Sequence, residues 1–99
     1  MALVYVSAVI TARQGREADL ERELAAVVAE VRREAGCLRY DLHRAGDGLR
    51  FFFYEIWESP AHLEAHAGSA HMAAMRRATA DMAAGPADVA LWEGVDVRP

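Results

Sequence analysis

The chain has 99 residues, a length that fits a single domain with a modest hydrophobic core. Its net charge of −4 at pH 7 argues against a nucleic-acid-binding protein, because such proteins present a basic face to phosphates. The single cysteine, Cys37, excludes an internal disulfide, and no apolar run reaches the length of a membrane span or follows a signal-peptide pattern. We therefore expect a cytoplasmic protein.

The first half of the chain predicts a strand, a helix and a β-hairpin. β-branched residues favour a strand at Leu3–Ala12, and apolar residues at three- and four-residue spacing predict a helix over Arg16–Ala35 that ends at Gly36. Alternating residues at Cys37–Arg44 and the aromatic run at Arg50–Glu58 flank the turn sequence Gly-Asp-Gly. These two segments are expected to pair as antiparallel strands.

The second half predicts an interrupted helix and a last strand. Ser59-Pro60 is typical of an N-cap followed by the first helical position. The helix is interrupted at Gly68-Ser69, where Ser69 can cap a second helix that reaches Ala84. Asp88–Val97 predicts a strand, with Gly94 as a candidate bulge.

The order β-α-β-β-α-β predicts an α+β domain of the ferredoxin-like, split βαβ class over residues 1–99. Its helices can cover only one face of a four-stranded antiparallel sheet. The third strand nevertheless places apolar residues on both faces, with Phe51, Phe53 and Trp57 on one and Phe52, Tyr54 and Ile56 on the other. Because an exposed apolar face is costly, we expect a homodimer that pairs sheet to sheet through an isologous interface.

The aromatic strand contains the first candidate site residues. Glu55 lies between Phe53 and Trp57, where a carboxylate needs a partner or has a raised pKa. It is a candidate general base or ligand anchor, although a structural bond to an arginine such as Arg39 or to a helix terminus is the commoner role. Trp57 is either a pocket residue that donates its indole N–H to a bound oxygen or a core residue. Tyr54 is either a packing residue of the dimer face or a phenol donor.

The histidines follow on the interrupted helix. His62 and His66 are four residues apart and share a helix face, but no HExxH pattern or further ligand accompanies them, so no metal site is predicted. His66 and His71 flank the Gly68-Ser69 break and could face Glu55 as acid–base groups. The alternative is that they form a polar tie that stabilises the break.

The remaining patterns are mostly structural. Met72 and Met75 recur at helical spacing and are core residues or the flexible wall of an apolar pocket. Cys37 follows a helix C-terminus, where a thiolate is disfavoured, and is expected to be a small buried residue. The sequence has no phosphate-binding glycine loop or dinucleotide fingerprint, which argues against a built-in nicotinamide or flavin domain.

Three runs, GCLRYDLHR at Gly36–Arg44, FYEIWES at Phe53–Ser59 and AHAGSAH at Ala65–His71, resemble the antibiotic biosynthesis monooxygenase (ABM) domain family. The resemblance is strongest to its quinol monooxygenase-like members and extends over Leu3–Val97. It implies a dimeric α+β barrel that oxidises a small electron-rich phenol, quinol or anthrone with O₂. It also implies that no cofactor takes part, because the deprotonated substrate itself reduces oxygen.

The resemblance also implies roles for individual residues. Trp57 corresponds to a pocket tryptophan of the family, and the candidate catalytic groups are His66, His71, Trp57 and Glu55. The candidate substrate-binding residues are Tyr54, Phe53, Arg39, Met72 and Met75. Haem-degrading relatives use an asparagine near Ser7 or Ala8 and a histidine near Met75 or Arg76, and this sequence has neither. An isomerase or other non-oxidative enzyme for a small carbonyl compound, and a non-catalytic dimeric ligand-binding protein, remain alternatives, since a fold alone does not fix a function.

Overall fold

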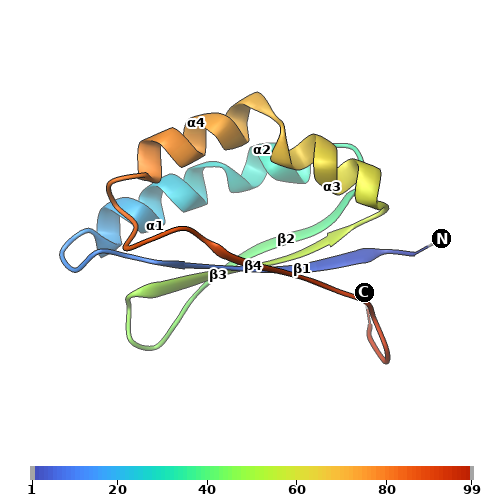
Figure 1. The fold of residues 1–99 in the computed structure, drawn as a ribbon, viewed down its shortest axis with the longest axis horizontal. Helices are drawn as coiled ribbons and strands as arrows, with labels where there is room; N and C mark the ends of the chain where they lie inside the picture. The colour runs from blue at the N-terminus through green and yellow to red at the C-terminus, as the bar shows by residue number, and fades with distance from the viewer. Residues whose placement is uncertain (1, 99) are drawn as a thin grey trace.

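The computed structural model describes residues 2–98 as one sheet covered on one face by helices (Figure 1). The strands are β1 (Val4–Thr11), β2 (Cys37–Arg44), β3 (Arg50–Trp57) and β4 (Asp88–Trp92). They are antiparallel and lie in the order β2-β3-β1-β4. The helices are α1 (Glu17–Ala26), α2 (Val28–Arg32), α3 (Pro60–Ala67) and α4 (Ala70–Thr79). The predicted ferredoxin-like arrangement is confirmed.

The helix predicted over Arg16–Ala35 is two helices. α1 ends at Ala26 and α2 begins at Val28, so Val27 separates them, and α2 ends at Arg32. Consecutive β-branched valines have reduced helix propensity, which is consistent with a break at this point. The turn after α2 then contains Gly36 with φ of +78°, a conformation that glycine adopts without strain.

The last helix and the last strand are both shorter than predicted. α4 ends at Thr79 instead of Ala84, because the following residues pair with the end of β1: Ala84 donates its backbone N–H to the carbonyl of Thr11 at 2.8 Å. β4 ends at Trp92, so Gly94 lies outside the strand and is not a bulge within it. Gly94 instead lies against the ring of Tyr5, where a Cβ atom would be 3.0 Å from that ring.

The helix-facing side of the sheet forms the core. Its fully buried aromatic residues are Tyr40, Phe51 and Trp57, which pack with leucines of α1. Glu55 also faces this side, at the centre of the sheet, where its backbone is paired with Val6 of β1 and Tyr40 of β2. The fold thus places one carboxylate in the middle of an apolar core and under the helices.

The opposite face of the sheet has no helix over it (Figure 1). Phe52 and Tyr54 of β3 are half-buried there, and Trp92 of β4 donates its indole N–H to Ser7 Oγ at 2.8 Å while remaining 59% exposed. Val89 and Leu91 of β4 are more than half exposed on the helix-facing side. The β4 edge is therefore apolar and uncovered on both faces.

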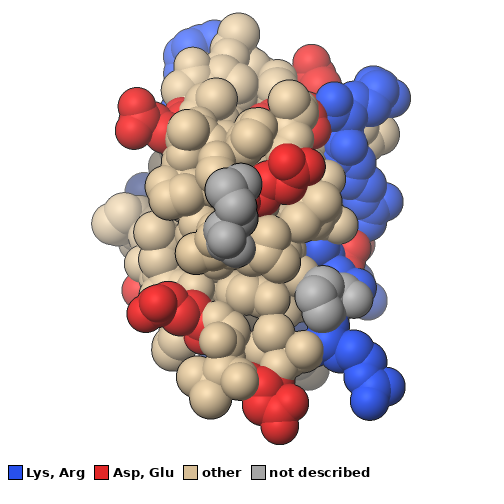
Figure 2. Space-filling view, turned by 90° about the vertical axis from the view of Figure 1, so that its right-hand side faces the viewer, with Lys and Arg blue, Asp and Glu red and all other residues tan. Residues whose placement is uncertain are grey.

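Charged side chains are unevenly distributed over the surface. The basic side chains visible in Figure 2 gather mainly along one side of the molecule, and acidic side chains are scattered elsewhere. Arginines of β2 and α2 are paired, with Arg32 and Arg39 on Asp41 at 3.1 and 3.8 Å. Within residues 2–98 no helix has both the length and the apolar character that crossing a membrane requires.

Candidate functional site

An apolar cavity of about 220 Å³ lies between the sheet and the helices α3 and α4. Most of its lining is apolar and comes from both layers: Val6, Ala8, Ile10, Phe53, Leu63, Met72 and Met75. Four side chains bring polar groups to it: Tyr40, Glu55, His66 and Arg76. Ala87 and Val89, from the segment that leads into β4, also line it. This combination of apolar walls and a few convergent polar groups is typical of a small-molecule site, here for a small ligand.

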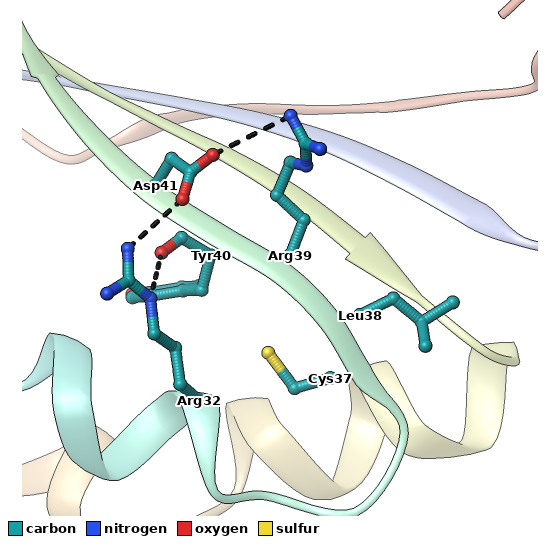
Figure 3. Close-up of a pocket in the computed structure, with 6 residues that line it drawn as sticks. All are labelled: Arg32, Cys37, Leu38, Arg39, Tyr40 and Asp41. Atoms are coloured by element: carbon teal, nitrogen blue, oxygen red, sulfur yellow. Dashed lines mark hydrogen bonds and ion pairs between the residues drawn. The ribbon is translucent and has the colours of Figure 1, made fainter. Parts of the chain in front are cut away.

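A larger hollow of about 440 Å³ lies beside β2 and is lined by Arg32 and residues 37–41 (Figure 3). Its polar groups are engaged with one another: Arg32 donates to the carbonyl of Tyr40 and to the carboxylate of Asp41, both at 3.1 Å. Figure 3 shows Arg39 extending from the side of β2 opposite to Cys37 and Tyr40. We therefore take the apolar cavity under α3 and α4 as the candidate site.

Glu55 is held in the cavity by Trp57. Its Oε1 accepts a hydrogen bond from the indole Nε1 at 2.9 Å, and both side chains are buried. Burial raises the pKa of Glu55, while the bond from Trp57 and the nearby imidazole of His66 oppose that rise. Two expectations are corrected: the partner of Glu55 is Trp57 and not Arg39, and the indole N–H of Trp57 is already used and does not await a bound oxygen.

His66 reaches the same cavity from the last turn of α3. Its Nδ1 lies 3.0 Å from Glu34 Oε2, and its ring packs on Trp57 with centroids 4.6 Å apart. A carboxylate on Nδ1 accepts the proton there, which leaves Nε2 as the acceptor nitrogen of the neutral ring. His66 is thus oriented as a proton acceptor beside Glu55 and Tyr40.

His71 lies on the other side of Glu34 and outside the cavity lining. Its Nε2 is 2.6 Å from Glu34 Oε2 and its Nδ1 is 3.5 Å from Glu30 Oε2. Glu34 therefore joins α3 and α4 across the Gly68-Ser69 break, as the polar-tie alternative predicts. The atoms of Glu34, His66 and His71 that could ligate a metal lie within 4.8 Å of one another.

The other candidate residues divide between the two faces of the sheet. Phe53, Met72 and Met75 line the cavity. Arg39 and Tyr54 do not: they lie together on the open face, with the guanidinium carbon 5.8 Å from the centre of the phenol ring. A role for this pair in the cavity is therefore not supported by their positions.

Two residues of the site were missed from the sequence. Tyr40 is 1% exposed, stacks on Phe53 with centroids 4.6 Å apart, and lines the cavity; burial raises the pKa of its phenol far above the usual value. Alternation along β2, together with the buried aromatic strand beside it, is the signal that could have identified Tyr40. Glu34 follows a helix end and is 32 residues from His66, so nothing local indicates their contact.

The chain is similar to known proteins over most of its length. The family model described as antibiotic biosynthesis monooxygenase matches residues 3–78. A Mycobacterium tuberculosis protein named "Putative monooxygenase Rv0793" is 29% identical over 93 residues, which cover 94% of this chain and 92% of that protein. Its solved structure matches with a TM-score of 0.92 at 28% identity, over 99% of this chain and all of that one. The solved structure of PA3566 from Pseudomonas aeruginosa matches with a TM-score of 0.91 at 34% identity, over 97% of each chain.

Proposed function

Since this chain belongs to the antibiotic biosynthesis monooxygenase family, we propose that it oxidises a small electron-rich phenol, quinol or anthrone with O₂, without a cofactor. The observation that supports this most is the apolar cavity between sheet and helices that Glu55, His66 and Tyr40 all line. An aromatic ring would pack against its aliphatic and aromatic walls. The three polar groups would then surround the ring's hydroxyl or its acidic carbon.

The proposed reaction balances without a further reductant. A phenol of formula C₆H₆O, the simplest example, reacts with O₂ to give a quinone, C₆H₄O₂, and water. One oxygen atom enters the ring as a carbonyl and the other leaves as water, while the substrate loses all four electrons that O₂ gains. The protein therefore has to promote loss of a proton, so that the electron-rich anion transfers electrons to O₂.

The polar groups of the cavity fit that task. The burial that raises the pKa of Glu55 makes its carboxylate a stronger proton acceptor than an exposed one. His66 Nε2 is a second acceptor in the same cavity, and the Tyr40 hydroxyl is a donor that can stabilise the anion. Exclusion of water strengthens these interactions. Arg76 lines the cavity as well, but it donates to the carbonyl of Ala67 at 2.9 Å, which favours an uncharged aromatic substrate over a phosphorylated one.

Oxygen consumption with a panel of hydroquinones, phenols and anthrones tests the proposal. We expect one O₂ consumed per product and one ¹⁸O atom incorporated from ¹⁸O₂. Glu55→Gln should lower turnover by about 10²–10⁴-fold if the carboxylate is the base. Glu58→Gln, which changes an exposed glutamate three residues away, is the matched control. Turnover without oxygen, with proton exchange next to a carbonyl, would instead indicate an isomerase, and saturable binding without turnover would indicate a binding protein.

We also propose that two copies pair through the open face of the sheet. The support is the apolar row of Phe52, Tyr54 and the 59%-exposed Trp92, together with the uncovered β4 edge. A two-fold contact would bury the same residues of each copy, which a single chain leaves exposed. Light scattering at micromolar concentration measures this directly, and a monomeric mass would contradict it.

A further inference from the structure

We propose that Glu34, His66 and His71 form a binding site for a divalent transition-metal ion of the zinc class. Glu34 is 16% exposed and the side chain of His66 is 6% exposed, so the cluster is largely shielded from solvent. Within residues 2–98 these three residues are the only group of three or more with suitably close ligand atoms. The inference does not rest on the proposed oxidation, since its readouts need no substrate; an ion on His66 Nδ1 would leave the ring proton on Nε2, so His66 would be a donor to the cavity in the metal-bound chain.

The donor set and spacing suit zinc. Two imidazole nitrogens and one carboxylate are a common protein ligand set for zinc, with a fourth position left for water. Ligand bonds of about 2.1 Å at tetrahedral angles separate ligand atoms by about 3.4 Å. Glu34 Oε2 lies 3.0 Å from His66 Nδ1 and 2.6 Å from His71 Nε2, so small side-chain movements would admit an ion.

The surrounding residues orient His71 for metal binding. Its Nδ1 faces Glu30 Oε2 at 3.5 Å, and a carboxylate on one ring nitrogen leaves the lone pair of the other nitrogen free for a metal. His71 Nε2 and Glu34 Oε2 are 2.6 Å apart, and a metal would take the position between these two atoms. Arg32, the arginine of α2, donates to Asp41 at 3.1 Å.

The break between α3 and α4 creates this arrangement. Residues five apart on a continuous helix differ by about 140° around its axis and would not face a common ligand. Ser69 begins α4 anew by accepting a hydrogen bond from the backbone N–H of Met72 at 3.4 Å. As a result, the last turn of α3 and the first turn of α4 both face Glu34. His62 and His66 both lie on α3, so their four-residue spacing did not indicate a site that is formed by His66 and His71.

Calorimetric titration of untagged, chelator-treated protein with ZnCl₂ tests the site, with MgCl₂ as the metal control. We expect one Zn²⁺ per chain and no response to Mg²⁺, which prefers oxygen ligands. His71→Ala and Glu34→Gln should each weaken Zn²⁺ binding by more than about 100-fold, and Glu30→Gln by about 10–100-fold as an outer partner. His62→Ala, one turn from His66, is the matched control and should bind as wild type does.

Imidazole ¹⁵N NMR of the wild-type protein gives an answer even if a variant does not fold. Zn²⁺ should shift the Nδ1 resonance of His66 and the Nε2 resonance of His71, and leave both rings of His43 and His62 unchanged. Absence of stoichiometric Zn²⁺ uptake would overturn the proposal. So would loss of binding in His62→Ala, or shifts confined to His43 and His62. Substrate turnover is not needed for any of these readouts.

Discussion

Trp57→Phe is the most informative change, because it removes the only hydrogen bond to Glu55 that the described residues show while keeping an aromatic ring in place. Trp57 is 0% exposed and Glu55 is 5% exposed, so the bond that is lost is a buried one. Leaving a buried acceptor unsatisfied costs about 1–3 kcal/mol, and the smaller ring leaves a cavity that adds to this cost. We expect a loss of about 2–4 kcal/mol of unfolding free energy, which a domain of ordinary stability survives.

The same change should raise the pKa of Glu55 further, because the bond from Trp57 is a main influence that lowers it. A carboxyl whose pKa is higher in the folded than in the unfolded state stabilises the fold fully below its ordinary value near 4.5. That contribution is lost as pH rises through the folded-state pKa. In Trp57→Phe the decline in stability should therefore extend to higher pH, and in Glu55→Gln it should be absent.

Urea unfolding over a pH series, with ¹³C NMR titration of the Glu55 carboxyl carbon, measures both effects without a substrate. A double-mutant cycle with Glu55→Gln should give a coupling energy of about 1.5–3 kcal/mol at pH values where Glu55 is ionised, the range for a hydrogen bond to a charged group. A coupling energy near zero, or a Glu55 pKa that falls or stays constant in Trp57→Phe, would refute our account of the site.

Three further changes test other parts of the molecule. His66→Gln keeps a donor for Glu34 but removes the imidazole acceptor nitrogen, so kcat should fall about 10²–10⁴-fold with little change in the free energy of unfolding. His43→Gln changes an exposed histidine and should leave kcat unchanged. Phe52→Glu should shift light-scattering mass from dimer to monomer, and an unchanged dimer would place the interface elsewhere. Gly36→Ala should cost more than about 1 kcal/mol in thermal unfolding, because φ is +78° and the added methyl would collide with His62.

Local patterns accounted for the strands because each strand carries its own signal. Alternation in β2 and β3 and the turn between them fixed the hairpin, and Ser59 and Ser69 fixed where α3 and α4 begin, each accepting the expected backbone hydrogen bond. The ends of α4 and β4 were misplaced because non-local pairing decides them: residues after Thr79 leave the helix to bond with the end of β1.

The site was predictable where its contacts are local and unpredictable where they are not. Glu55 and Trp57 are two residues apart on one strand face, and their proximity follows from alternation alone. The contact of His66 with Glu34 joins residues 32 apart, through the relative placement of α2 and α3. Arg39 was assigned to Glu55 by charge complementarity, but the strand directs it to the opposite face.

The cavity wall is built from residues inside and outside the stretch that the family model matches. Tyr40, Glu55 and His66 lie within residues 3–78, whereas Ala87 and Val89, which also line the cavity, lie beyond it. The groups proposed for proton transfer and this part of the apolar wall are thus carried by separate stretches of chain. Substitutions at Ala87 or Val89 would therefore reshape the space for a ligand while leaving Tyr40, Glu55 and His66 in place.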